Sequence, residues 1–460
     1  MDGPHGYRQI MRVGLPLIAS MASSTVMQFT DRLFLSHYSV DAIAAALPAS
    51  VASMTMLLTL TGICGYTSVL IAQYMGAGAP KRIGSALWQG IWCALAGAVI
   101  MGLTWKPAEW FFALAGHEPA IQVLEVEYFR VLTLGAGFAL LSSTLAGFFS
   151  GRGKTRPVMV ANVIAAIVNV PLDYLLIFGG FGIPSLGIFG AGLATVIGWV
   201  ISAAILAYVV FTRKNDNGFC VFKGCKVEWD MLRRLLRYGL PSGMNFFAEM
   251  AGTAWFSFEV GYFGKTALAA STIAFSLNSV VFLPMLGLNI ALSTLVGQAM
   301  GRGRPDEAEK ITGNTLHLAF AYMFPLALFL AAGAGPLMDI FIPGGMSEEE
   351  YAPVRQLGMI FLYFVAMYSL VDAGNIVFFG ALKGAGDTLG IMFLLCFGGI
   401  CFLIIPILTI RYLGHASAIN YWIVFMIYII LLALVAAVRF YRRKWHSIRM
   451  VEVAANGDAG

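Results

Sequence analysis

A few polar side chains interrupt otherwise apolar stretches of this 460-residue sequence, and their types suit the binding of a small cation. Asp31 lies in the first such stretch, and Asn169 and Asp173 are four residues apart in a later one, hence on one face of a helix. Pro171 between them leaves a backbone carbonyl of the preceding turn without its donor. Thr195 adds a hydroxyl. Such oxygen atoms suit Na⁺, and a carboxylate removed from water equally suits a proton.

A second set of polar residues lies in the C-terminal half. Glu249 occupies one apolar stretch, and Tyr368 and Asp372 form another pair four residues apart. Because a carboxylate at bilayer depth is costly, each is a functional candidate. We expect Glu249, Tyr368 and Asp372 to bind a cation, a proton or the substrate. A simpler interpretation of Asp31 is that it pairs with Arg32 or caps a helix end.

The composition is that of a membrane protein. Hydrophobic residues make up 59% of the chain, charged residues 12%, and the mean hydropathy is +0.80. A bilayer core needs about 20 apolar residues per helix. Twelve stretches meet this need, near 12–35, 45–72, 87–105, 128–150, 158–178, 188–211, 240–263, 271–297, 313–337, 356–382, 389–410 and 418–440.

The distribution of Lys and Arg predicts the orientation. Alternate loops hold most of the basic residues, with the densest group in the segment 212–238. The opposite loops carry acidic residues, including Glu348 to Glu350. By the positive-inside rule, both termini are expected in the cytoplasm. The expected location is the plasma membrane, most simply a bacterial inner membrane. The net charge of +5 then reflects topology and does not indicate nucleic-acid binding.

A repeat divides the chain into two halves. The segment Gln73 to Pro80 returns as Gln298 to Pro305, 225 positions later, and Gly151 to Thr155 returns 233 positions later. Six spans precede the basic segment and six follow it, so both halves enter the membrane in the same direction. The sequence therefore predicts an all-α membrane protein of twelve transmembrane helices in two six-helix lobes related by pseudo-two-fold symmetry. The expected parts are an N-lobe (1–211), a cytoplasmic linker (212–238), a C-lobe (239–445) and a polar tail (446–460).

The two copies of the glycine-rich segment, Met75 to Pro80 and Met300 to Pro305, follow the second span of each half. We expect each to be a loop that turns sharply at the cytoplasmic side. A surface helix after the turn is an alternative, but a loop with turn glycines and nothing more is the favoured interpretation. Gly151 to Thr155 resembles the end of a phosphate-binding loop, but Phe148 occupies the position of its first glycine. No residue pattern supports an enzyme, and no cofactor is expected.

The chain resembles the multidrug and toxic compound extrusion (MATE) family of transporters. The resemblance covers the sequence from about residue 10 to residue 442. The motifs that carry the resemblance are Gly14 to Pro16, Phe29 to Phe34, the two Gln-x-Met-Gly-x-Gly segments, Gly190 to Thr195 and Gly239 to Pro241.

The resemblance implies two six-helix lobes, a central cavity, and export of drug-like, often cationic compounds in exchange for Na⁺ or H⁺. It assigns Asp31, Asn169, Asp173 and Thr195 to an N-lobe cation site that could hold Na⁺. It assigns Glu249, Tyr368 and Asp372 to a C-lobe carboxylate site. One bacterial branch of the family is described with the N-lobe aspartates and another with the C-lobe carboxylates, and this chain has both sets.

The favoured function is that of a secondary active antiporter for cationic amphipathic small molecules. The protein is expected to be a monomer and to contact membrane lipid. A lipid-linked oligosaccharide flippase of the same superfamily is an alternative, although such proteins typically have extra spans and a basic groove. A passive channel is a third possibility, but it would not need paired carboxylates in both halves. The sequence leaves the coupling ion open between Na⁺ and H⁺.

Overall fold

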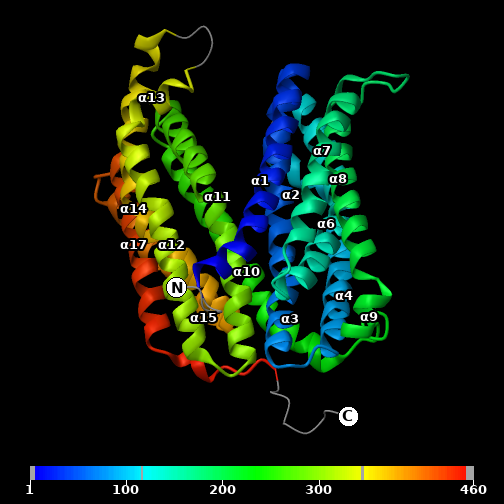
Figure 1. Cartoon of the computed structure of the whole chain (residues 1–460). Helices are drawn as coiled ribbons and strands as arrows, with labels where there is room; N and C mark the ends of the chain where they lie inside the picture. Colours follow the sequence, from blue (N-terminus) through cyan, green and yellow to red (C-terminus); the bar gives the residue numbers. More distant parts are fainter. Residues whose placement is uncertain (1–5, 115–117, 343–346, 452–460) are drawn as a thin grey trace. The chain divides into compact units, whose positions relative to one another are not determined.

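The computed structural model describes residues 6–114, 118–342 and 347–451, and in these ranges the regular elements are helices (Figure 1). One isolated bridge joins Gly180 and Ile183 in the turn between two helices. The all-α prediction is confirmed for this part of the chain. The helices up to the linker are α1 (Tyr7–Tyr38), α2 (Val40–Gly65), α3 (Thr67–Gly76), α4 (Arg82–Leu103), α5 (Ala108–Ala113), α6 (Pro119–Gly151), α7 (Arg156–Phe178), α8 (Gly187–Val210) and α9 (Arg213–Phe219).

The helices from α10 onward repeat this plan. They are α10 (Trp229–Gly261), α11 (Lys265–Gly301), α12 (Pro305–Ala332), α13 (Ala334–Asp339), α14 (Glu348–Ala385), α15 (Thr388–Gly398), a π-helix η1 (Gly399–Ile404), α16 (Ile405–Tyr412), α17 (Ala418–Tyr441) and a short 3₁₀ helix η2 (Lys444–Ser447).

Eleven helical segments of the described residues are long and apolar enough to cross a membrane. They correspond to eleven of the twelve predicted spans; α2 and α3 form one of them, and α15 to α16 form another. The remaining predicted span, 240–263, lies within α10, which is 33 residues long but carries charged residues along its length. Its first turns hold Asp230 and the basic residues of the predicted linker, and Glu249 lies farther along.

Short polar side chains begin several of the helices. The Ser39 hydroxyl accepts from the backbone N–H of Ala42 at the start of α2, and Ser417 does the same for Asn420 at the start of α17. Ser347 and Glu350 form a reciprocal capping box at α14. These contacts satisfy backbone donors that a helix leaves unpaired in its first turn.

The predicted single span 389–410 is helical throughout but changes its winding in the middle. The π-helix η1 separates α15 from α16. It begins after Gly398 and ends next to Pro406, which has no N–H to donate to the preceding turn. A π-helical turn contains about one residue more than an α-helical turn. The wider turn lets the helix continue past the proline ring without a break.

The structure divides into two compact units. Unit 2 consists of Arg12–Phe247, Gly297–Arg304 and the residues from Arg449 onward. Unit 1 consists of the residues up to Met11, Ala248–Val296 and Pro305–Ile448. The helices α1 and α10 contribute to both units, so the lobe boundaries at 211 and 239 remain predictions. Of the predicted tail 446–460, residues 452–460 lie outside the described part of the chain.

Unit 2 has an alanine-rich core that lets its helices approach closely. Leu35 on α1 packs with Ala45 and Ala49 on α2, with Phe129 on α6 and with Ile188 on α8. Small residues at such contacts are the usual means by which helices pack tightly in lipid.

The predicted linker is an ordered part of unit 2. The Trp88 indole on α4 donates to the Val221 carbonyl at 2.6 Å, and the Gln89 amide donates to the Lys226 carbonyl at 3.0 Å. The Arg152 guanidinium at the end of α6 lies over the ring of Phe219 at 4.3 Å. The linker, with α9 inside it, is therefore attached to the ends of α4 and α6.

Unit 1 has an aromatic core. Trp422 on α17 is fully buried, stacks on Phe361 of α14 at 4.6 Å, and donates its indole N–H to the Ser271 hydroxyl at 2.7 Å. Phe256 of α10 packs edge-on against the same indole at 5.7 Å. Phe256 is the residue that the repeat pairs with Asp31, so the two units carry opposite chemistry at this position.

The glycine-rich repeats form turns, but the helix that follows each turn is a span and not a surface helix. Gly78 and Gly303 adopt φ of 71° and 70°, a left-handed conformation that favours glycine. After the turns, α4 begins at Arg82 and α12 begins at Pro305, and both are long enough to cross a membrane. The favoured interpretation, a loop with turn glycines, agrees with the structure, whereas the alternative of a surface helix does not. The apolar residues continue almost from the first helical turn, which gives no room for a separate helix.

Candidate functional site

Three of the four predicted N-lobe residues come together in the interior of unit 2. Asp31 is 6% exposed, and Asn169 and Asp173 are fully buried. The Tyr128 hydroxyl on α6 donates to Oδ2 of Asp31 at 2.8 Å. Asp31 and Asp173 are close enough for their charges to interact. Two carboxylates and an amide thus meet in a region from which water is excluded.

The helices position these groups in a simple way. Asp31 lies seven residues before the end of α1, and Asn169 and Asp173 lie on one face of α7. Pro171 is inside α7, as expected, and it interrupts the hydrogen bonding of the helix between the two polar residues.

Thr195 lies on α8 near the level of Asp173. The glycines on either side of it locate α8 against α7: a Cβ on Gly190 would meet the backbone of Leu176, and a Cβ on Gly198 would lie 3.7 Å from the Cβ of Asn169. Thr195, which is half-buried, falls between these two contacts. The structure therefore places Thr195 at the level of the group but shows no contact of its hydroxyl with the carboxylates.

The atoms of this group are not satisfied by one another. Among the described residues, Oδ1 of Asp31, both carboxylate oxygens of Asp173 and both amide atoms of Asn169 are buried without a hydrogen-bond partner. Such groups are expensive to bury unless a proton or a cation compensates the oxygen atoms. The donor set of carboxylate, amide and hydroxyl oxygens suits a hard cation such as Na⁺, or a proton held by the carboxylates.

The geometry favours a buried polar site at Asp31 over the simpler interpretation. Arg32 is exposed, whereas Asp31 is buried and bonds to Tyr128. Asp31 also lies well inside α1, which extends to Tyr38, so it does not cap the helix.

The predicted C-lobe residues also form a group, within unit 1. Asp372 on α14 accepts a hydrogen bond from the Asn375 amide at 3.3 Å, and Glu249 on α10 is close enough to interact with the Asp372 charge. Tyr368 is 1% exposed, and its hydroxyl has no hydrogen-bond partner among the described residues. Glu249 is exposed and Asp372 half-buried. This group is therefore more accessible than the one in unit 2.

Three contributors were missed in the sequence. Tyr128 binds Asp31, Asn375 binds Asp372, and Tyr428 on α17 lies within electrostatic range of Glu249 and Asp372. Tyrosine is common in membrane helices, so its type alone gives no signal. Asn375 follows Asp372 by three residues on the same helix face, and this spacing could have identified it.

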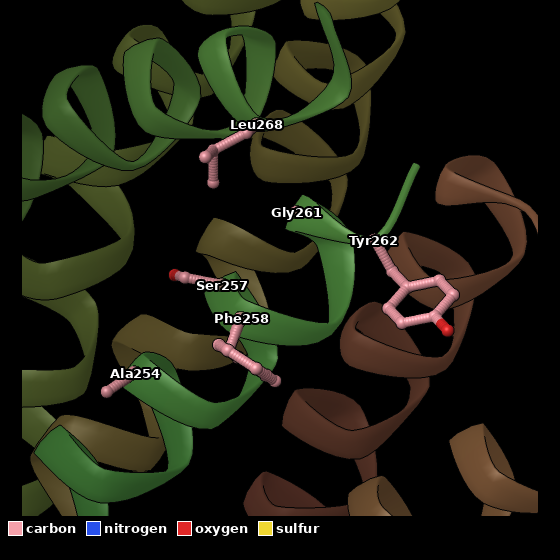
Figure 2. A pocket seen from close by; sticks show the side chains of 6 residues that line it. All are labelled: Ala254, Ser257, Phe258, Gly261, Tyr262 and Leu268. Atoms are coloured by element: carbon pink, nitrogen blue, oxygen red, sulfur yellow. The ribbon is translucent and has the colours of Figure 1, made fainter. Parts of the chain in front are cut away.

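A pocket of about 540 Å³ lies elsewhere in unit 1, and none of the three predicted C-lobe residues lines it. It is lined by residues of α10 and α11, with Ser257 and Phe258 on one side and Leu268 on the other (Figure 2). The lining also includes Tyr262, over whose ring the Arg411 guanidinium lies at 4.6 Å. The walls are mostly apolar and aromatic, which suits an amphipathic molecule.

Tyr128→Phe should reduce ion-driven transport without unfolding the protein. The substitution keeps the ring but removes the hydroxyl that orients Asp31. Hydrogen bonds to charged groups contribute about 1.5–3 kcal/mol, so we expect the initial transport rate to fall by roughly tenfold or more. The measurement is the rate in vesicles under an imposed ion gradient. Tyr174→Phe, at an exposed position, is the matched control. Equal rates for Tyr128→Phe and the wild type would contradict the role of this contact.

The fold, with its many long apolar helices and two polar groups among them, is that of a polytopic membrane protein. The family model MatE matches residues 16–175 and 241–410, so the chain belongs to the MatE family of transporters. The two matched segments fall in the two halves of the chain, as the internal repeat requires.

Individual relatives agree with this assignment. The chain is 28% identical over 391 residues to the probable multidrug resistance protein NorM of Thermotoga maritima, covering 84% of this chain and 82% of that protein. Its fold matches a MOP superfamily transporter from Pyrococcus furiosus with a TM-score of 0.86 at 20% identity, covering 95% of both chains. A MATE family transporter in an outward-facing conformation also matches with a TM-score of 0.86, covering 95% of this chain and 96% of that one. The predicted twelve-helix fold of two six-helix lobes is thereby confirmed.

Proposed function

We propose that this protein is a secondary active multidrug efflux antiporter, which exports organic cations in exchange for Na⁺ or H⁺. The observation that carries the proposal is the buried group of Asp31, Asn169 and Asp173, with its unpaired oxygen atoms. A transporter that uses an ion gradient needs a site that binds the ion strongly in one state and loses it in another. Two interacting carboxylates in a dry interior provide such a site.

The two groups differ in the size of cation that they can accept. Asp173 and Asn169 are fully buried, so only a proton or a small dehydrated ion can reach them without moving helices. Glu249 is exposed and Asp372 half-buried, and the pocket in the same unit is lined in part by the aromatic residues Phe258 and Tyr262. We therefore assign the coupling ion to the N-lobe group and the organic cation to the C-lobe carboxylates, with cation–π contacts as a further attraction.

The coupling follows from charge. An ion that enters the N-lobe group neutralises Asp31 or Asp173, which removes the cost of burying two like charges. The state that binds the ion is thereby stabilised, and the substrate is released outward. Binding of the organic cation from the cytoplasm then favours the state in which the ion leaves. A ligand shifts such an equilibrium only through its different affinity for the two states.

The available driving force is sufficient for export. One elementary charge moving through about 100 mV supplies about 2.3 kcal/mol, which corresponds to roughly a 50-fold bias between the two states. A bias of this size is enough to move a substrate against a substantial concentration ratio.

The same proposal includes location and assembly. The basic residues of the linker and of the loop after α6 support a cytoplasmic location for those segments, with both termini on the same side of a bacterial inner membrane. Each polar group is made by residues of a single chain, so a monomer is sufficient. The activity is transport and not catalysis, and it needs no cofactor.

The test is dye efflux from vesicles that contain the purified protein. An inward Na⁺ gradient and a pH gradient are imposed separately on vesicles loaded with a cationic dye. We expect at least one gradient to drive export above the passive leak. Efflux that responds to neither gradient overturns the antiporter, and dye movement that only follows its own concentration gradient indicates a channel.

A further inference from the structure

A second polar group, which the proposed function does not use, lies deeper in unit 2 toward the linker. The Asn162 amide on α7 donates to the Ser20 hydroxyl on α1 at 2.5 Å, and its oxygen accepts from the Ser202 hydroxyl on α8 at 2.6 Å. The Ser142 hydroxyl on α6 lies 2.8 Å from that of Ser202. Four helices thus each contribute one oxygen-bearing side chain to a group that we call the inner cluster: Ser20, Ser142, Asn162 and Ser202.

The residues of the inner cluster on α1, α7 and α8 lie on the same helix faces as those of the carboxylate group. Ser20 and Asp31 are eleven residues apart on α1, and Asn162 and Asp173 are eleven residues apart on α7. Eleven residues are about three turns of an α-helix, so each pair lies on one helix face, about 16 Å apart along the axis. Thr195 and Ser202 on α8 are two turns apart, on a shared face. The same three helices therefore carry two polar layers, one above the other.

A methionine side chain lies between the two layers. A Cβ on Gly198 of α8 would lie 2.8 Å from the terminal methyl of Met27 and 3.7 Å from the Cβ of Asn169. The absence of a side chain at Gly198 leaves the space that Met27 occupies. Met27 is seven residues after Ser20 on α1, on the face shared with Asp31. Its unbranched side chain moves easily among rotamers, which suits a separator between two sites.

The chemistry of the inner cluster suits a dehydrated alkali cation. A serine hydroxyl in a helix can donate its proton to a carbonyl of the preceding turn, which frees the oxygen to ligate a cation. The amide of Asn162 offers an oxygen after rotation about its terminal torsion. Four polar side chains from four helices are joined by hydrogen bonds in the inner cluster, and Ser20 and Ser202 are 5% and 4% exposed. Serine and asparagine have no group that titrates near neutral pH, so the cluster would not hold a proton.

We propose that the inner cluster is a second Na⁺ site, at which the coupling ion pauses between the carboxylate group and the cytoplasmic side of α1, α6, α7 and α8. This inference rests on the proposed cation coupling and specifies its ion. Met27 separates the two sites, so that a cation passes from one to the other only when α1 moves relative to α8.

The test is equilibrium binding of ²²Na⁺ to the purified full-length protein. In the variant Asp31→Asn/Asp173→Asn, which removes both carboxylates, we expect weak Na⁺ binding to remain. Adding Asn162→Leu should abolish it. Adding Asn162→Asp instead should raise the Na⁺ affinity by about tenfold or more, because a charged ligand replaces a neutral one.

The gain of affinity in Asn162→Asp separates an ion site from a purely structural role, because a lost helix contact does not strengthen ion binding. Size-exclusion profiles show whether each variant is folded, and Thr133→Ala is the matched control, since its buried hydroxyl donates to carbonyls of its own helix. Absence of Na⁺ binding in the carboxylate variant, or binding that neither Asn162 substitution changes, overturns the inference.

Failure of the second Na⁺ site and failure of the proposed antiporter give different results in these experiments. If no ion gradient drives dye efflux, the antiporter proposal fails whatever the binding data show. If a gradient drives efflux and the inner cluster binds no Na⁺, the antiporter proposal stands and the inner cluster is only a contact among helices.

Discussion

Asp31→Asn and Asp173→Asn should each abolish ion-driven efflux while leaving a folded protein in the membrane. The substitution is nearly isosteric and removes one negative charge from a group that is at most 6% exposed. The remaining carboxylate then lacks the like charge that made ion or proton binding favourable. Without a binding event that differs between the two states, the gradient no longer biases the transport cycle.

The measurement is the initial rate of dye efflux under an imposed Na⁺ or pH gradient, at matched protein content. We expect rates at the level of empty vesicles. Asp41→Asn, in the first turn of α2, serves as the control, because it removes a carboxylate outside the group. Wild-type efflux in both Asp31→Asn and Asp173→Asn would exclude the N-lobe as the coupling site.

The same change in the C-lobe group should have a different effect. If Asp372 attracts the organic cation, Asp372→Asn raises the dye concentration needed for half-maximal efflux. Abolished efflux in the N-lobe variants together with a raised dye requirement in Asp372→Asn would assign the ion to the N-lobe group and the dye to the C-lobe group. Abolished ion binding in Asp372→Asn would reverse this assignment.

The carboxylates of the site could be found in the sequence because a charge inside an apolar stretch is rare and costly. Asp31, Asp173 and Asp372 stand out for this reason alone. Tyr128 could not be found in the same way, since it is one of 17 tyrosines and its role depends on which helix lies opposite Asp31. The unpaired atoms of Asn169 are likewise a property of packing, not of spacing.

The spans were predicted well because hydrophobic length is a strong signal. The glycine-rich segments form the predicted turns, and the alternative of a surface helix after each turn is excluded because α4 and α12 begin directly after them. α10 is a different case. Its extent back to Trp229 and its membership of both compact units follow from contacts among helices, which periodicity does not reveal.

The repeat predicts the scaffold but not the chemistry. The offset of 233 that relates Gly151 to Gly384 pairs Tyr128 with Phe361, and the offset of 225 pairs Asp31 with Phe256. In unit 1 these two phenylalanines pack against Trp422. An aromatic core thus takes the place of the carboxylate group. At these two positions the described part of unit 1 therefore carries aromatic rings where unit 2 carries a carboxylate and its tyrosine partner.

The glycine-rich segment is the most similar part of the two repeats, and unit 2 offers a structural reason for this. Unit 2 contains both copies, Gln73 to Gly78 and Gly297–Arg304. A Cβ on Gly76 would lie 2.9 Å from the carbonyl carbon of Gln298, and a Cβ on Gly301 would lie 2.9 Å from the carbonyl carbon of Gln73. The two copies therefore contact each other reciprocally, glycine against backbone. A contact between like segments requires the same residue on both sides, as in an isologous interface.

Gly76→Ala and Gly301→Ala should each destabilise the protein strongly. The neighbour of the added methyl group is backbone, which cannot rotate away as a side chain does, so the ends of α3 and α11 must separate. Overpacking costs about 1–3 kcal/mol even where side chains can adjust, and we expect more here. The expected result is a lower midpoint of thermal unfolding in detergent and a smaller folded fraction by size exclusion.

The matched control is Gly78→Asn, two residues farther along the same segment. Gly78 has a positive φ, but a Cβ there would meet no atom within 4 Å. Asparagine tolerates the left-handed conformation better than other residues, so the substitution should cost little. Wild-type stability in both Gly76→Ala and Gly301→Ala would show that the two segments do not need this close approach. In that case, the repetition of the motif would have to be explained by the turn at Gly78 and Gly303 alone.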